Sequence, residues 1–219
     1  MAALQQFGAA GSLSPNWHDP LQVAFKRLLD LVGSTLLLIL LTPLLLLLGA
    51  LVKLTSKGPA LYRWKVVGEN GGHFIGYKFR SMVSNADELK SHLEHLNEMT
   101  GPMFKLTNDP RLTPLGSWMR KYSLDELPQL FSVVKGDMSL VGPRPPLATE
   151  YARFTEYQKQ KLSVKPGITC LWQVNGRNQV SDLDQWVAMD LEYIRNWSLW
   201  LDITILFKTM AAVLAGSGK

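Results

Sequence analysis

The stretch from residue 123 to residue 146 reads SLDELPQLFSVVKGDMSLVGPRPP. Two adjacent carboxylates, Asp125 and Glu126, precede apolar residues at helical spacing, and the pair at 135–136, Lys-Gly, is typical of a helix end. Pro128 is tolerated only in the first turn of a helix, which sets the helix start at Asp125 or just before it. The pattern predicts a helix whose positive N-terminal end carries both carboxylates, and such an end also attracts phosphate.

A simpler interpretation of the two acids is a capping box, because Ser123 and Glu126 have the spacing of a serine cap and its reciprocal glutamate. Charges of both signs, however, are concentrated between residues 105 and 144. Arg144 lies between two prolines, which stiffen the backbone that carries it. A rigid arginine beside a carboxylate pair suits the binding of a phosphate together with a divalent cation. Asp125 and Glu126 are therefore candidate catalytic residues and metal ligands.

Upstream of this stretch, residues 60–67 and 73–82 read as two short strands around a glycine-rich turn, and we expect them to form a hairpin. Alternation along the second strand would place Lys78 and Arg80 on one face, either as phosphate ligands or as solvated surface charges. Downstream, a Pro-Gly and an Asn-Gly pair bracket a predicted short strand at 168–174 that would return its flanking cations towards the same pocket. The predicted substrate and phosphate ligands are Lys78, Arg80, Arg120, Arg144, Lys165 and Arg177.

The composition points to a membrane. Of 219 residues, 47% are hydrophobic and 19% charged, which is more apolar than a small soluble core requires. The net charge of +5 suits an anionic lipid surface or a phosphorylated substrate. Cys170 is the only cysteine, which excludes an intrachain disulfide and a thiolate metal cluster. The sequence contains no glycine-rich nucleotide-binding loop, which disfavours kinase-like and dinucleotide-binding functions. It also contains no Gly-x-Ser-x-Gly turn, which disfavours a serine hydrolase.

An uncharged run at residues 31–52 is long enough, at about 33 Å as a helix, to cross the hydrocarbon core. The Thr42–Pro43 pair interrupts it, and Lys26 and Arg27 precede it while further basic residues follow it. Positive charge on both flanks places both on the cytoplasmic side. We therefore predict a re-entrant membrane helix at 21–56, anchored by Lys26, Arg27, Thr42 and Pro43; the alternative is a single-pass anchor with a proline kink.

The whole chain is predicted to be α+β and mostly helical. Residues 1–20 are expected to form a mobile tail, and residues 57–219 a compact catalytic domain on the cytoplasmic face with interfacial amphipathic helices. Helices are predicted at 84–100 and 151–162 and from 181 onward. The last of these regions contains three tryptophans, for which the membrane interface and buried packing are the two interpretations: Trp186, Trp197 and Trp200.

With these residues in view, the sequence resembles the bacterial polyprenyl-phosphate phosphoglycosyl transferases of the monotopic type, from about residue 25 to the C-terminus. The landmarks are Lys26-Arg27-x-x-Asp30, Thr42-Pro43, Lys78-Phe79-Arg80, Leu124-Asp125-Glu126-Leu127, Gly136 to Pro145, Pro166 to Thr169 and Asn175-Gly176-Arg177. Thr42 stands where a serine is usual and Cys170 where a glycine is common. Many relatives carry extra membrane helices ahead of this unit, so the chain is expected to be the minimal catalytic form.

The resemblance implies a transfer of sugar 1-phosphate, with a hexose as the expected sugar, from a UDP-sugar to undecaprenyl phosphate. It implies a covalent aspartyl phosphosugar on Asp125, release of UMP and a requirement for Mg²⁺, with Glu126 either positioning the metal or handling a proton. The reaction would be the first membrane step of exopolysaccharide, capsule, O-antigen or glycoconjugate synthesis at the bacterial inner membrane. Expected partners are the two substrates, the membrane, downstream glycosyltransferases and a second copy of the chain, but no nucleic acid.

Two other functions remain open on the sequence alone. Asp182 and Asp184 form an Asp-x-Asp pair that could serve a metal-dependent membrane glycosyltransferase, although helix capping also accounts for them. A membrane-bound scaffold without catalytic activity would need only the basic surface and interfacial tryptophans. Product analysis separates the two enzymes, because phosphosugar transfer releases a nucleoside monophosphate and glycosyl transfer a diphosphate.

Overall fold

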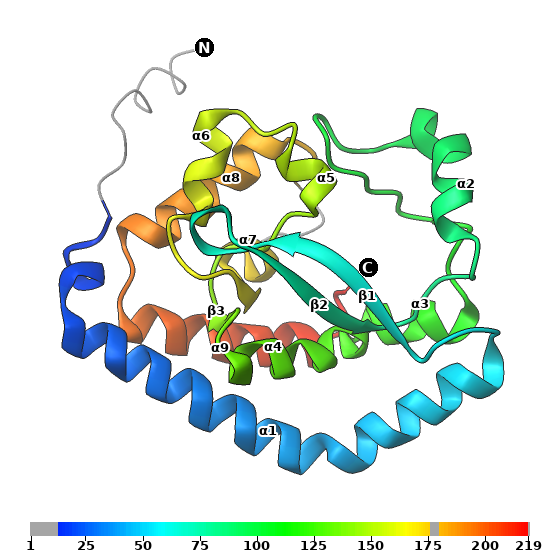
Figure 1. Ribbon diagram of the computed structural model, residues 1–219, viewed down its shortest axis with the longest axis horizontal. Coiled ribbons are helices and arrows are strands. Elements are labelled where there is room, and N and C mark those ends of the chain that lie inside the picture. The colour runs from blue at the N-terminus through cyan, green and yellow to red at the C-terminus, as the bar shows by residue number, and fades with distance from the viewer. Residues whose placement is uncertain (1–12, 176–179, 219) are drawn as a thin grey trace.

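A computed structural model describes residues 13–175 and 180–218. Helices dominate this part of the chain, accompanied by two small two-stranded sheets (Figure 1), so the predicted mostly helical α+β class is confirmed. The α-helices are α1 (Pro20–Thr55), α2 (Ala86–Leu93), α3 (Pro114–Lys121), α4 (Leu130–Lys135), α5 (Ala148–Tyr151), α6 (Glu156–Lys159), α7 (Leu171–Val174), α8 (Leu183–Arg195) and α9 (Leu199–Leu214). The strands are β1 (Leu61–Val67), β2 (His73–Phe79), β3 (Ser139–Val141) and β4 (Gly167–Thr169). Short 3-10 segments are η2 (Pro15–His18), η3 (Glu69–Gly71), η4 (Glu94–Leu96), η5 (Leu124–Gln129) and η6 (Gln160–Leu162).

Helix α1 is the one helix among the described residues that is long and apolar enough to cross a membrane. It has 36 residues, contains Pro43, and bends near its middle (Figure 1). Proline has no N–H to donate within the helix, which explains the predicted bend. The hydroxyl of Thr42 donates to the carbonyl of Leu38 at 2.6 Å, one turn before the break. Most of the helix surface is exposed and apolar, while its buried residues are Lys26, Asp30, Ser34, Leu48 and Val52.

The first half of α1 is attached to the rest of the chain by polar groups. Lys26 forms a buried ion pair with Asp202 of α9 at 2.6 Å and donates to the carbonyl of Val141 at 3.0 Å. Arg27 donates to the last carbonyls of α4, at 2.7 and 2.9 Å. The carboxylate of Asp30 accepts from the hydroxyl and amide groups at the start of β3. The sequence predicts Lys26 and Arg27 as membrane anchors, and the structure shows that both bind protein groups.

The second half of α1 packs through Leu48 and Val52 onto Phe79 and Met119, which form a small hydrophobic cluster. Beyond this cluster, the guanidinium of Arg80 donates to the carbonyl and the hydroxyl of Ser56 at 2.7 and 2.8 Å, where α1 ends. Both ends of one long helix are therefore fixed to the same body of protein.

Strands β1 and β2 form the predicted antiparallel hairpin around the glycine-rich turn. The second strand ends at Phe79 instead of at residue 82, because Met82 pairs with Leu112 in a separate bridge. Strands β3 and β4 are parallel and very short. The predicted strand at 168–174 is wrong beyond Thr169, since α7 follows it. The predicted helices at 84–100 and 151–162 are each broken into shorter helical segments.

The main hydrophobic core gathers around α8, and it decides between the two interpretations of the tryptophans. Trp186 and Trp197 are buried, so buried packing holds for them, whereas Trp200 on α9 is 75% exposed. Within the predicted tail, residues 13–19 contact this core: Trp17 stacks on Trp197 at 4.0 Å between ring centroids, and its indole N–H donates to the carbonyl of Ile194. Residues 1–12 lie outside the described part.

Candidate functional site

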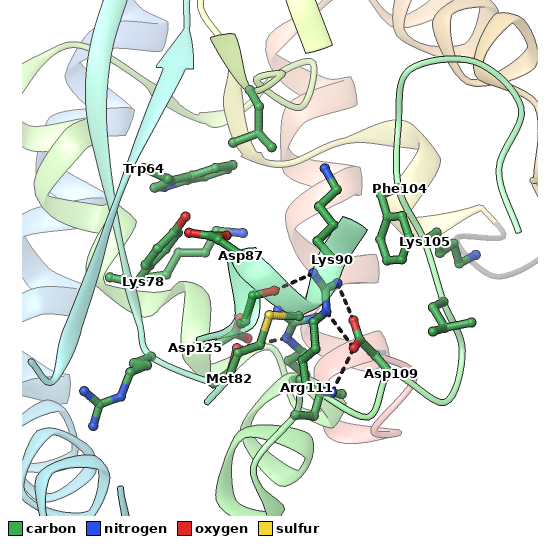
Figure 2. Close-up of a pocket in the computed structure, with 18 of the residues that line it drawn as sticks. Trp64, Lys78, Met82, Asp87, Lys90, Phe104, Lys105, Asp109, Arg111 and Asp125 are labelled. Carbon is green, nitrogen blue, oxygen red and sulfur yellow. Dashed lines mark hydrogen bonds and ion pairs between the residues drawn. The ribbon is translucent and has the colours of Figure 1, made fainter. Parts of the chain in front are cut away.

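A cavity of about 470 Å³ lies between the β1–β2 hairpin, the segment 82–112 and η5 (Figure 2). It brings together six of the residues that the sequence singles out, from four separate parts of the chain: Lys78, Arg80, Arg120, Asp125, Glu126 and Arg144. Lys165 is not among the residues that line the cavity, and Arg177 lies outside the described residues. Arg80 lines the cavity while its guanidinium is engaged at the end of α1.

The two acids lie in the 3-10 segment η5 and not in the first turn of an α-helix as predicted. Pro128 cannot donate to the carbonyl of Leu124, so regular α-helical bonding begins only after it, at α4. The predicted stop is confirmed, because Gly136 ends α4 with φ of +98°. Ser123 precedes the acids in a left-handed conformation, with φ of +54°, and its side chain makes no capping bond. The capping-box interpretation of Asp125 and Glu126 is therefore wrong.

Partly buried cations lie near both acids. The ammonium of Lys78 lies 2.9 Å from a carboxylate oxygen of Glu126. Burial lowers the pKa of Lys78, and the carboxylate of Glu126 opposes that shift only in part. Arg120 donates from Nε to the hydroxyl of Ser81 at 3.0 Å, and burial lowers its pKa against the opposing charge of Asp125. The cavity is thus a region of mixed charge in which an anionic group would meet several cations.

Arg144 follows a close approach of two chain segments, after the end of β3 and at the start of β4. The amide of Gly142 donates to the carbonyl of Thr169 at 3.0 Å, and the amide of Gly167 donates to the carbonyl of Pro143 at 2.9 Å. A Cβ on Gly167 would lie only 2.0 Å from the Gly142 nitrogen, so this approach needs glycine. Beyond this close approach, the Nε of Arg144 is buried without a hydrogen-bond partner in the described structure. An orphaned donor in a cavity wall suits an anionic ligand.

The far wall of the cavity comes from the segment 97–112, which sequence analysis did not assign to the site. The side chain of Asn97 binds four backbone groups of this segment and so fixes its path. Arg111 pairs with Asp109 at 2.6 Å and lies over the ring of Phe104 at 4.9 Å. Burial raises the pKa of Asp109, but the hydrogen bonds from Arg111 prevail and hold it below its usual value. No short sequence motif identifies this wall, because its residues are spread along the segment and come together only when the loop has folded.

The chemistry of the donors decides which metal they fit. No group of three or more histidine, cysteine, aspartate or glutamate side chains is placed to hold a metal within residues 13–175 and 180–218. Mg²⁺ commonly uses one or two carboxylates together with substrate phosphates and water. Asp125 and Glu126 fit that smaller contribution. Cys170 is buried, and burial raises the pKa of its thiol to about 12, so it is unsuited to act as a nucleophile.

The alternative Asp-x-Asp pair has structural partners. Asp182 caps α8 by accepting from the amide of Asp184 at 3.1 Å, and it also accepts from the hydroxyl of Thr100. Asp184 accepts from the side-chain amide of Gln158 at 2.8 Å. Neither acid lines the cavity. Helix capping and loop attachment account for both, which disfavours the glycosyltransferase alternative.

Comparisons with a family model and with individual proteins both match this chain to sugar transferases. Residues 21–216 match the family model described as bacterial sugar transferase. The chain is 48% identical over 197 residues to the undecaprenyl-phosphate galactose phosphotransferase of Salmonella typhimurium, covering 88% of this chain and 41% of that protein. It is 47% identical over 193 residues to the galactosyl transferase CpsE of Streptococcus agalactiae, covering 88% and 43%.

A further relative has nearly the same length as the matched region. The exopolysaccharide production protein ExoY of Rhizobium meliloti is 41% identical over 198 residues, covering 89% of this chain and 87% of that protein. The chain thus spans about two fifths of the first two relatives and most of the third. The family match, at residues 21–216, includes the whole described site.

Proposed function

Because the chain belongs to the bacterial sugar transferase family, we propose that it transfers a sugar 1-phosphate from a UDP-sugar to undecaprenyl phosphate and releases UMP. The observation that carries the proposal is the meeting, in the same cavity, of two carboxylates and four cations predicted to bind substrate or phosphate. Relatives named as undecaprenyl-phosphate galactose and glucose phosphotransferases support the lipid acceptor and a hexose. The reaction would begin the lipid-linked synthesis of a polysaccharide or glycoconjugate.

In this mechanism a carboxylate oxygen of Asp125 attacks the phosphorus that bears the sugar. The bond from that phosphorus to the bridging oxygen breaks, and UMP leaves with the bonding electrons. A phosphate oxygen of the lipid then attacks the same phosphorus, which frees the Asp125 carboxylate and yields the lipid diphosphosugar. An ionised carboxylate needs no base for the first step, provided that nearby cations offset its repulsion from the phosphates.

The cations of the cavity supply that compensation. Arg144 presents an unpaired Nε, and Arg120 is partly buried and close enough to Asp125 to feel its charge, so both are suited to hold phosphate oxygens during transfer. Asp125 and Glu126 would hold Mg²⁺, which supplies charge neutralisation of the diphosphate when bound. Lys78 keeps the carboxylate of Glu126 oriented towards the same site.

The bent helix α1 would bring this site to the lipid. At the helical rise, 36 residues would extend over about 54 Å when straight, and the bend near Pro43 lets both ends of the helix bind the same body of protein. The exposed middle of the helix is apolar, with Ile39 67% and Leu40 73% exposed. These features support a re-entrant helix that enters and leaves the cytoplasmic leaflet of the inner membrane, and the exposed Trp200 and Phe207 of α9 suit the same interface.

The test is to mix purified protein in lipid nanodiscs with a labelled UDP-sugar and Mg²⁺, first without and then with undecaprenyl phosphate. We expect a phosphosugar adduct on a peptide containing Asp125 in the first case, and release of UMP, not UDP, in the second. Asp125→Asn should lose nearly all turnover and the adduct while still binding the donor, because an amide is a poor nucleophile.

Asp182→Asn is the matched control, since it removes an acid outside the cavity. It should retain most of the turnover. UDP as product would favour the glycosyltransferase alternative, and full activity of Asp125→Asn would refute the nucleophile assignment. An absence of turnover with every UDP-sugar, together with an intact fold, would favour the scaffold.

A further inference from the structure

Trp64 is a large buried side chain in the cavity wall, directly next to the residue that pairs with Glu126. In the β1–β2 register it lies opposite Gly76, and Lys78 is two residues further along the same face. Diagonal neighbours of this kind are within reach of aromatic and long side chains. The ammonium of Lys78 lies 4.2 Å from the centroid of the Trp64 ring, and Figure 2 shows the two side chains near each other beside the cavity.

Gly76 provides the space for this arrangement. A Cβ at position 76 would lie 2.3 Å from Nε1 of Trp64, so any side chain there would displace the indole. That Nε1 is buried and has no hydrogen-bond partner within the described residues. Since no hydrogen bond orients the ring, its position is set by packing across Gly76. The indole is therefore held flat on the hairpin with one face available to Lys78.

The ammonium of Lys78 is consequently held from two sides. One side is the ring of Trp64 and the other is the carboxylate of Glu126, at 2.9 Å. A lysine side chain ordinarily samples many rotamers, and a cation over an indole face is attracted to it most strongly when both are shielded from water. Both groups are shielded from water here, because Trp64 is 7% exposed and the Lys78 side chain is 16% exposed.

We propose that Trp64 is a positioning residue of this site: its indole holds the ammonium of Lys78 against Glu126, and so fixes the Glu126 carboxylate beside Asp125. Trp64 acts through Lys78 and not on the transferred group. Gly76 belongs to the same device, because it admits the ring. The proposal rests on the proposed function for its kinetic consequence, whereas its structural consequence can be measured without any turnover.

The kinetic test compares Trp64→Leu with Trp64→Phe. Loss of the ring should lower kcat about tenfold with little change in the KM of the nucleotide sugar, while phenylalanine, which keeps a ring face, should restore most of kcat. Tyr77→Leu is the matched control, because it removes the contact of Arg63 with the Tyr77 ring in the same hairpin at a residue outside the cavity. It should leave kcat unchanged.

The second test measures how freely the Lys78 ammonium reacts. Purified protein is reductively methylated with formaldehyde and a borane reagent, and the modification of Lys78 is followed over time by mass spectrometry. Trp64→Leu should be methylated several-fold faster at Lys78 than wild type, Trp64→Phe only slightly faster, and Tyr77→Leu at the wild-type rate. If Trp64→Leu does not fold, Gly76→Ala gives the same test, because it keeps the indole but displaces it.

Equal methylation of Lys78 in all folded variants would overturn the proposal, whether or not the wild type is active. So would a wild-type kcat in folded Trp64→Leu. If wild type shows no phosphosugar transfer but Lys78 becomes more reactive when the ring is removed, the proposed function fails and the positioning of Lys78 stands. The two conclusions are therefore tested separately.

Discussion

At Lys78, burial and the neighbouring carboxylate of Glu126 shift the pKa of the ammonium in opposite directions. Burial lowers the pKa below the 10.5 of an ordinary lysine, while Glu126 raises it, and burial prevails. The ammonium therefore loses its proton at a lower pH than an exposed lysine would, and with it the ion pair to Glu126. Below that pH the pair is complete.

We accordingly predict that kcat falls as the pH rises through the lowered pKa of Lys78, before exposed lysines titrate. A Lys78→Arg variant that retains activity should lose this alkaline limb, since arginine stays protonated throughout the range. Tyr62, which also lines the cavity, does not mimic the effect, because burial raises its pKa. The measurement is a profile of kcat from about pH 7 to about pH 10 for both proteins, and an identical alkaline limb in Lys78→Arg would contradict the assignment.

Arg144 invites a second substitution at the same scale. Arg144→Lys keeps the charge but loses the forked guanidinium that can hold two phosphate oxygens, so kcat/KM should fall roughly 10- to 100-fold, by analogy with other charge-assisted bonds of about 1.5–3 kcal/mol. Lys165→Met, outside the cavity, should be nearly neutral. Steady-state kinetics of the two variants test both statements, and an equal loss in the two would mean that Lys165 acts on the substrate after all.

At the level of elements, the sequence predicts what local patterns determine. The hairpin follows from two β-rich runs around a glycine-rich turn, and the bend of α1 from one proline. Asp125 and Glu126 are predicted as candidate site residues from the residues next to them in the sequence. The prolines on either side of Arg144 are visible in the sequence too, but the backbone path that directs Arg144 depends on the close approach of Gly142 and Gly167, which are distant in sequence.

The remaining elements depend on contacts that the sequence does not display. Helix α3 begins with Pro114, which reads as a turn until Thr113 is seen to cap it. Trp64 reaches Lys78 only once the register of the hairpin is known, and the wall around Phe104 exists only because Asn97 folds its loop. Specific contacts of single side chains, some local and one across the hairpin, made these parts of the site unpredictable.

The attachment of α1 to α9 is an element-scale contact with a measurable energy. The Asp202 carboxylate accepts from Lys26, from the hydroxyl of Tyr193 and from the indole of Trp197. Asp202→Asn leaves the Lys26 ammonium buried without its counter-charge, which typically costs about 3–5 kcal/mol. We expect a loss of that size in the free energy of unfolding, measured by denaturant titration in detergent.

The double variant Lys26→Met/Asp202→Leu is the control for this prediction. Removing both charges avoids an isolated buried ion, so the double variant should be more stable than Asp202→Asn alone. If the double variant is instead the less stable protein, the loss in Asp202→Asn does not come from an unpaired ammonium, and the ion pair itself stabilises the attachment of α1.

At the scale of the whole molecule, one helix carries apolar residues outward and polar residues inward. Its buried positions in the first half are Lys26, Asp30 and Ser34, spaced four apart along one face, whereas the exposed faces are largely leucine. This distribution is the reverse of that in a water-soluble helix and suits a lipid environment. The first half of α1 is attached to the protein by polar contacts and the second half by apolar contacts. Together these attachments set the position of the exposed apolar part of α1 relative to the cavity.

The topology can be tested with single introduced cysteines. The native Cys170 is buried, with a thiol pKa of about 12, so it should react little with thiol reagents. If α1 is re-entrant, Leu21→Cys and Lys57→Cys should both be labelled only from the cytoplasmic side of sealed vesicles. Labelling of the two positions from opposite sides would establish a single-pass helix.

Pro43→Leu tests the cause of that topology. Leucine restores the missing helical hydrogen bond, so α1 can become straight. While both of its ends are attached to the protein, it must stay bent. A straight helix can keep only one attachment, and the apolar run is long enough to span the bilayer. In the Pro43→Leu background, we expect part of the Leu21→Cys label to become accessible from the far side, while Lys57→Cys stays cytoplasmic. Unchanged labelling of Leu21→Cys would show that the attachments of Lys26, Arg27 and Asp30, and not the proline, determine the return of the helix.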